Sequence, residues 1–110
     1  MKPIPKPEKA AVTKYDSLAA SLGEKLGAES SKMFGMPCLK IRKKAFCGLF
    51  GSDMVFKLTG EEHKKALALA GARLFDPTEM NRPMKEWVVV PYKHSKLWKE
   101  FAIDSLKYVG

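Results

Sequence analysis

The sequence predicts an α+β domain in which a curved antiparallel β-sheet is flanked by N-terminal, middle and C-terminal helices. The first observation is that residues 35–58 read as three short strands separated by two tight turns. The second is the helical spacing of apolar residues near both ends of the chain. The third is an apolar strand at 87–90 that ends at Pro91 and is expected to join this meander.

The chain has 110 residues and a formal net charge of +8, with 17 lysines and only three arginines. This length predicts one domain, over residues 11–110, preceded by a flexible Pro/Lys-rich arm at 1–10. No apolar run approaches the roughly 18 residues of a membrane span, and the N-terminus lacks the apolar core of a secretory signal. A basic, cytoplasmic protein with no membrane association is therefore expected.

The first helix is expected over residues 12–26, because Tyr15, Leu18 and Leu22 fall on one stripe of a 3.6-residue period. Gly27 is expected to end it. A single stripe of this width is typical of a helix that packs on a sheet.

Two tight turns divide the meander, and they set its register. The first is expected at 43–44 and pairs Ile41 with Phe46; the second is expected at the glycine-containing three-residue loop 51–53. Side chains alternate across a strand. One face is therefore predicted to collect Leu39, Ile41, Phe46, Phe50, Met54, Phe56 and Leu58.

A two-residue loop at 51–52 is the alternative, and it would shift the register by one residue. That shift would send Met54, Phe56 and Leu58 to the other face, so the three-residue loop is preferred. The opposite face is then expected to be solvated, mixed in character and basic near the first turn. It is predicted to carry Cys38, Lys40, Arg42, Ala45, Cys47, Leu49, Val55 and Lys57.

The remaining elements follow from shorter signals. A short strand is expected at 32–34, and Thr59 with Glu62 forms a capping box for a second helix that runs through Leu69 to Gly71. The other expected elements are an edge strand at 73–75, a polar loop at 76–83, the strand 87–90 and a last helix over 93–108.

Neither the cysteines nor the histidines form a recognisable catalytic or metal-binding motif. His63 and His94 have zinc-ligand spacing neither to each other nor to a cysteine. His63 is expected as a solvated helix residue, and His94 at the surface or as a helix cap. Cys38 and Cys47 are expected to be neighbouring free thiols, with a strained or redox-regulated disulfide as the alternative. We therefore expect no cofactor, no metal and no enzymatic activity; a small enzyme using Cys47 or His94 is the least favoured reading.

A basic cluster is the candidate contact site. It consists of Lys40, Arg42, Lys43, Lys44 and Lys57. Positive charge dominates non-specific nucleic-acid affinity, but this face lacks the exposed aromatic residues that single-strand readers use. A charged sheet face that discourages edge pairing is the favoured interpretation.

Three segments resemble the TfoX (Sxy) N-terminal domain family: residues 32–35 (KMFG), 54–58 (MVFKL) and 82–91 (RPMKEWVVVP), followed by an amphipathic helix. The resemblance covers most of the chain and implies a bacterial α+β domain without catalytic residues. TfoX itself is a regulator of natural competence with a second, helical domain, and the present chain is expected to be a single-domain relative. The resemblance implies a role through contacts with an unidentified protein partner, and that role could be regulatory. Non-specific nucleic-acid binding is the alternative.

Overall fold

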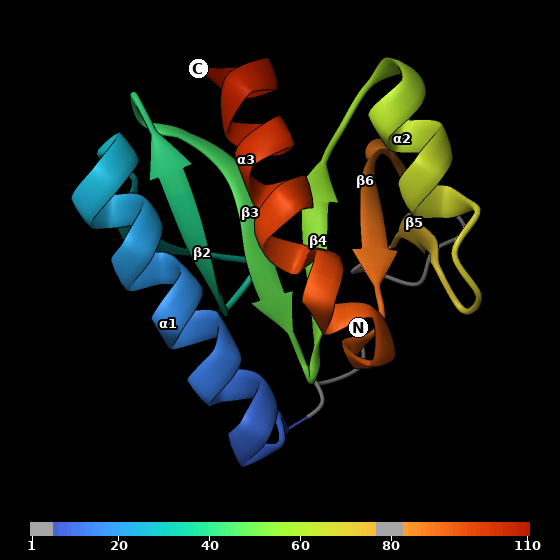
Figure 1. Cartoon of the computed structure of the whole chain (residues 1–110), viewed down its shortest axis with the longest axis horizontal. Coiled ribbons are helices and arrows are strands. Elements are labelled where there is room, and N and C mark those ends of the chain that lie inside the picture. The colour runs from blue at the N-terminus through green and yellow to red at the C-terminus, as the bar shows by residue number, and fades with distance from the viewer. Residues whose placement is uncertain (1–5, 77–82) are drawn as a thin grey trace.

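A computed structural model describes residues 6–76 and 83–110, which form one antiparallel sheet and its covering helices (Figure 1). The six strands lie in the order β1-β2-β3-β4-β6-β5, so the meander is extended by a hairpin-like pair from the second half of the chain. The elements in chain order are α1 (Lys9–Leu26), β1 (Glu29–Met33), β2 (Met36–Ile41), β3 (Lys44–Phe50), β4 (Asp53–Lys57), α2 (Gly60–Leu67), β5 (Arg73–Phe75), β6 (Met84–Val90), the 3-10 helix η1 (Tyr92–Leu97) and α3 (Trp98–Val109). The predicted fold class is confirmed.

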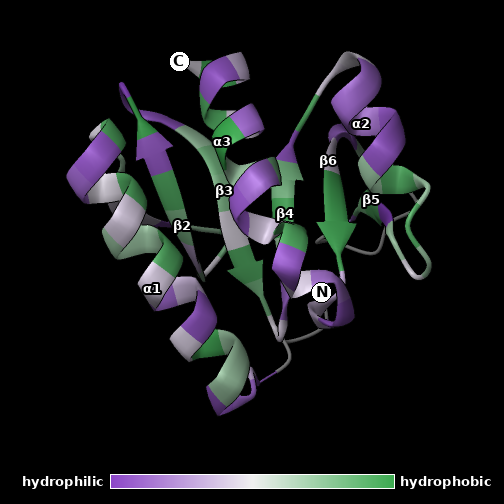
Figure 2. Cartoon of the chain, viewed as in Figure 1, coloured by the Kyte–Doolittle hydropathy of each residue, from purple (hydrophilic) through white to green (hydrophobic). Residues whose placement is uncertain are grey.

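The helices cover one face of the sheet. In Figure 1, α3 crosses in front of β3 and β4, α1 lies beside β2, and α2 stands next to β6. The strands under them are largely hydrophobic, whereas α2 is mostly hydrophilic (Figure 2). Beneath the helices lies a continuous core that contains Phe46, Phe56, Leu22, Trp98 and Phe101. None of the helices described is long and apolar enough to cross a membrane.

The opposite face has its own smaller core, because the sheet curves until its two ends approach. Phe34, in the turn between β1 and β2, makes an edge-to-face ring contact at 6.3 Å with Phe75 of β5, at the other edge. Phe75 also contacts Phe50 at 5.1 Å. This core consists of Met36, Val55, Phe75, Trp87 and Val89, with Met33, Ala45, Phe50 and Met84 partly buried around it. The prediction that the face opposite the helices is solvated was therefore wrong.

The register differs from the prediction at three points. The first turn is Arg42-Lys43, because Ile41 pairs with Lys44. A β-bulge follows at Phe46, so that Phe46 and Cys47 together oppose Leu39. The second turn is the two-residue loop 51–52 that sequence reasoning rejected, because Phe50 pairs with Asp53.

These differences in register largely cancel, so that most of the seven side chains still point to the same side of the sheet. A bulge moves the side chains of all later residues to the opposite face of the sheet, and so does a change of one residue in loop length. Six of the seven residues predicted to share a face therefore do lie in or against the core beneath the helices; Phe50 alone lies on the other side. Cys47 and Leu49, predicted for the solvated face, are buried beneath the helices, and Cys38 and Val55 are buried as well.

The outer elements follow the sequence with small shifts. Helix α1 begins at Lys9 and ends at Gly27, whose φ of 78° is the left-handed stop expected there. Strand β1 begins three residues earlier than predicted, and α2 ends at Leu67, before the predicted Leu69. The last helix is preceded by a 3-10 turn with a kink at His94. The polar loop prediction falls mostly on residues 77–82, outside the part described.

Candidate functional site

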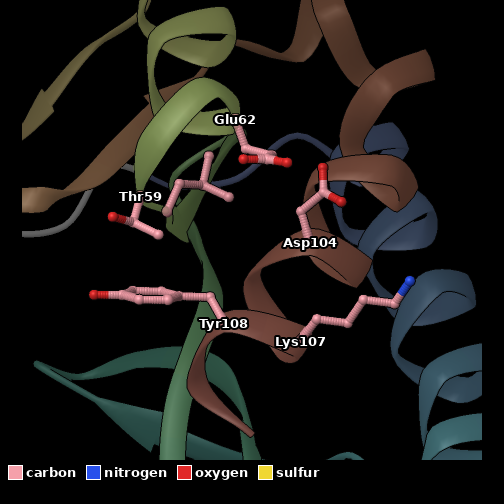
Figure 3. A pocket seen from close by; sticks show the side chains of 6 residues that line it. Thr59, Glu62, Asp104, Lys107 and Tyr108 are labelled. Atoms are coloured by element: carbon pink, nitrogen blue, oxygen red, sulfur yellow. The ribbon is translucent and has the colours of Figure 1, made fainter.

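Three surface features could carry function: a notch around Tyr108, a basic hairpin end, and a half-exposed aromatic patch. The notch lies between the start of α2 and the last turns of α3 (Figure 3). It is a cavity of about 290 Å³, and Leu58 is one of the residues that line it. Its walls are Thr59, Glu62, Asp104, Lys107 and Tyr108.

Tyr108 is the hub of a polar network at the edge of this notch. Its hydroxyl donates a hydrogen bond to Glu86 Oε2 on β6, and the Thr59 side chain also interacts with it. The bond to the Glu86 carboxylate, which favours the protonated phenol, raises the pKa of Tyr108. Lys57 Nζ lies 4.0 Å from Glu86 Oε1. The network ties α3 to the ends of β4 and β6.

Thr59 occupies the N-cap position of α2 as predicted, but it does not form the predicted capping box. Its side chain makes no cap hydrogen bond, and it interacts with the Tyr108 hydroxyl instead. The Glu62 side chain does not complete the capping box either. Figure 3 shows its carboxylate pointing toward that of Asp104. Burial and the neighbouring Glu62 charge raise the pKa of Asp104.

The five basic candidate residues do not form a single sheet face. Arg42 and Lys43 form the exposed first turn, with positive φ at both residues. Lys40 pairs with Ala45, and Lys44 and Lys57 line a hollow of about 200 Å³ with Tyr108 and Val109. Lys44 and Lys57 therefore sit near the C-terminal end of α3, where the helix dipole favours positive charge.

The aromatic patch lies at the turn between β1 and β2. Met33 pairs with Met36, leaving Phe34-Gly35 as a two-residue turn with φ values of 51° and 77°. Phe34 is 50% exposed, the largest value among the exposed large hydrophobic residues described. Its ring rests on Phe75, and Phe50 lies beyond it. We call Phe34 and the partly buried Met33, Phe50 and Met84, which surround the buried Phe75, the aromatic patch.

The histidines and cysteines occupy structural positions. His63 Nε2 lies 2.8 Å from the Lys85 carbonyl oxygen, and His94 Nε2 lies 2.9 Å from that of Ala70. Both residues are partly exposed at the surface. Cys38 and Cys47 are both free thiols, as predicted, but both are buried, although they were predicted for the solvated face. Burial raises the pKa of each thiol, most strongly that of Cys47. Within residues 6–76 and 83–110, no three His, Cys, Asp or Glu side chains are grouped to hold a metal ion.

Sequence reasoning missed the notch and the patch. The notch brings together Tyr108, Glu86 and Thr59, which lie far apart in the sequence, and their spacing does not indicate that they are in contact. Phe34 did carry a signal, since a phenylalanine before glycine between two strands marks a turn in which the ring has no strand partner.

Comparison of the chain with protein-family models, curated proteins and solved structures finds no match. The resemblance to the TfoX N-terminal domain family therefore stays a prediction.

Proposed function

We propose that this protein is a non-enzymatic binding domain that acts through protein–protein contacts, with the aromatic patch as its contact surface. The observation that carries the proposal is the 50% exposure of Phe34, backed by two further aromatic rings. Aromatic and methionine side chains are enriched in protein interfaces relative to other surface. Clustered apolar side chains at the surface of a domain mark interaction sites.

The backbone at Phe34 supports the same conclusion. Two-residue hairpin turns with positive φ at both positions strongly prefer Asn-Gly or Asp-Gly, because a bulky side chain is strained there. Phe34 adopts a φ of 51° at the first of these positions. A large aromatic residue held in a conformation of this kind, at an exposed turn, is of the type found where strain serves a function.

The surroundings of the histidines and cysteines favour a binding role over catalysis. In the part of the chain described, both histidine rings contact backbone carbonyl oxygens and both thiols are buried with raised pKa values. Buried thiols of raised pKa are poor nucleophiles. The resemblance to the TfoX N-terminal domain family adds a bacterial, cytoplasmic setting and a regulatory role to the proposal.

The experiment is capture of partners from a lysate of the source cells by the immobilised protein, with Phe34→Asn as the test variant. Asparagine fits the turn conformation, so the variant removes the ring without straining the backbone. Leu67→Asn is the matched control, because Leu67 is also an exposed large apolar residue, 37% exposed, but lies on α2. The proposal expects a specific protein to be retained by the wild type and the control and lost by Phe34→Asn. Equal retention by all three baits contradicts it.

Non-specific nucleic-acid binding is the second candidate, and one observation favours it: the hairpin end brings Lys44 and Lys57 to one hollow beside exposed Arg42 and Lys43. Affinity for duplex DNA should then fall steeply between 50 and 200 mM salt. A charge-reversed variant with glutamate at these four positions and at Lys40 should lose binding, whereas reversal of Lys14 and Lys25 on α1 should not. Equal losses would show that net charge, not this hairpin, is responsible.

A further inference from the structure

Strand β1 has one side of its backbone unpaired at the edge of the sheet. The strand order places β1 and β5 at the two edges, and β1 is the longer, with five residues against three. Its pairing with β2 is regular from Glu29 to Met33, without a bulge. Natural proteins protect exposed edges with prolines, bulges or several lysines, and β1 (ESSKM) has no proline and one lysine. Among the described residues, no strand pairs with its outer side.

The turn between β1 and β2 determines which backbone groups of β1 face outward. It is a two-residue turn that directly follows Met33, and the residues that flank such a turn exchange both of their backbone hydrogen bonds. Bonded and unbonded pairs then alternate along an antiparallel ladder, so Met33 and Ser31 direct their N–H and C=O groups to β2. The N–H and C=O groups of Ser30 and Lys32 therefore point away from the sheet. In the part of the chain described, no turn or loop bonds to them.

The side chains along this edge differ between the two faces of the sheet. Ser30 lies opposite Leu39, which belongs to the core beneath the helices, and the exposed Lys32 shares that face. No ion pair within the described residues involves Lys32. Met33 lies on the other face, in the aromatic patch beside Phe34. A strand added to β1 would therefore meet a positive charge on one face and apolar side chains on the other.

The charges of the chain favour a different protein over a second copy as the occupant of this edge. The formal net charge is +8, and a net charge of this size keeps identical molecules apart. The self-pairing that uses all five residues of β1 would also set Met33 opposite Glu29 of the second copy, where it gains no apolar contact. A segment that alternates acidic and apolar residues matches both faces, because successive side chains of a strand point to opposite faces.

We propose that β1 accepts an extended segment of a partner protein as a further antiparallel strand, and that this segment alternates acidic and apolar residues. Its acidic residues lie opposite Ser30 and Lys32 and exchange backbone hydrogen bonds with them. Its apolar residues lie opposite Ser31 and Met33, beside Phe34. In strand addition the main chain supplies the affinity and alternate side chains supply the specificity. The inference rests on the proposed function, because it names the partner segment that meets the aromatic patch.

Titration with a defined probe tests the inference: an octapeptide of alternating valine and glutamate, acetylated and amidated at its ends. Hydrogen exchange followed by NMR should be fast at the Ser30 and Lys32 amides of the free protein and slow in the complex. N-methylation of the glutamates removes the donors that face β1 and should weaken binding at least about 5-fold, the loss of two weak hydrogen bonds. N-methylation of the valines is the matched control and should leave the affinity unchanged, because those N–H groups point away from β1.

The charge of Lys32 is tested in the same titration. Lys32→Glu should weaken binding of the octapeptide at least about 2-fold, as expected for an exposed charge pair. Lys14→Glu makes the same change of net charge at an exposed position of α1 and should leave the affinity unchanged. An equal loss in both variants would show that net charge, not this edge, attracts the peptide, and would contradict the inference.

Three further results would overturn the inference: no saturable binding, equal affinity of the two N-methylated peptides, or binding without protection of the Ser30 and Lys32 amides. Failure of the proposed function gives a different result. Octapeptide binding that is unchanged in Phe34→Asn supports strand addition and contradicts the aromatic patch. A lysate partner that depends on Phe34, together with no octapeptide binding, contradicts strand addition alone.

Discussion

Gly48→Ala tests the observed strand register more sharply than a core truncation does. Gly48 lies opposite Cys38 on β2 and Val55 on β4. A Cβ atom added there would lie 2.7 Å from Met36 Cε and 2.8 Å from the carbonyl oxygen of Pro37. The methionine end can move, but the carbonyl belongs to the backbone of β2 and moves only with the strand.

Overpacking of this kind costs typically about 1–3 kcal/mol, and we expect Gly48→Ala to lower the free energy of unfolding by that amount. Urea unfolding measures it, with Ser30→Ala on the exposed edge strand β1 as a control expected to stay within about 0.5 kcal/mol. In the register predicted from the sequence, Gly48 would instead lie opposite Leu39 and Phe56. Unchanged stability of Gly48→Ala would therefore refute the reasoning.

Three further predictions concern the core and its ionisable groups. Phe56→Ala should lower the free energy of unfolding by about 3–5 kcal/mol, because Phe56 is fully buried against helix α3; Lys57→Ala, with only a long ion pair, should stay within about 0.5 kcal/mol in the same assay. Stability should fall as pH rises above about 8.5, the ordinary pKa of a free thiol, because the raised pKa of Cys47 keeps it neutral in the fold while the unfolded thiol ionises. A pH series of Cys47→Ala should show a weaker decline, and an identical decline would contradict this cause. Asp104→Asn should stabilise the protein at pH 7 but not below the usual carboxyl pKa, because the raised pKa of Asp104 means that its charge, beside Glu62, opposes folding; equal gains at both pH values would argue against it.

The helices and the strand order of the meander were predictable because they rest on local patterns. The stripe of Tyr15, Leu18 and Leu22 in α1 is buried as its 3.6-residue spacing indicates. Gly27 ends that helix because glycine adopts positive φ without strain. Signals of this kind need no knowledge of distant residues.

The register was not predictable, because the bulge and the shorter second loop have opposite effects on which face the later side chains occupy. The bulge at Phe46 leaves no trace in composition, and the first turn uses Arg42 and Lys43 where Asn-Gly would have been the signal. Sequence reasoning rejected the two-residue loop at 51–52 because, without a bulge, it separates the apolar residues. The correct loop was therefore discarded for a sound but incomplete reason.

The candidate sites were even less accessible to sequence reasoning. The aromatic patch depends on sheet curvature, which brings Phe34 and Phe75 together from opposite edges of the sheet. The hydrogen bond from the Glu8 backbone N–H to Ser52 Oγ likewise joins residues 44 positions apart in the chain. The basic residues could be identified from the sequence. The direction of their side chains depends on their strand partners, and these follow from the register.

The most direct test of the proposed contact surface is the affinity of the captured partner, once purified, for two truncation variants. Phe34→Ala should weaken binding at least about 30-fold, the effect of an interface residue whose removal costs 2 kcal/mol or more. Leu67→Ala, which removes an exposed apolar side chain from α2, should bind as the wild type does. Equal dissociation constants for the wild type and Phe34→Ala would contradict the account.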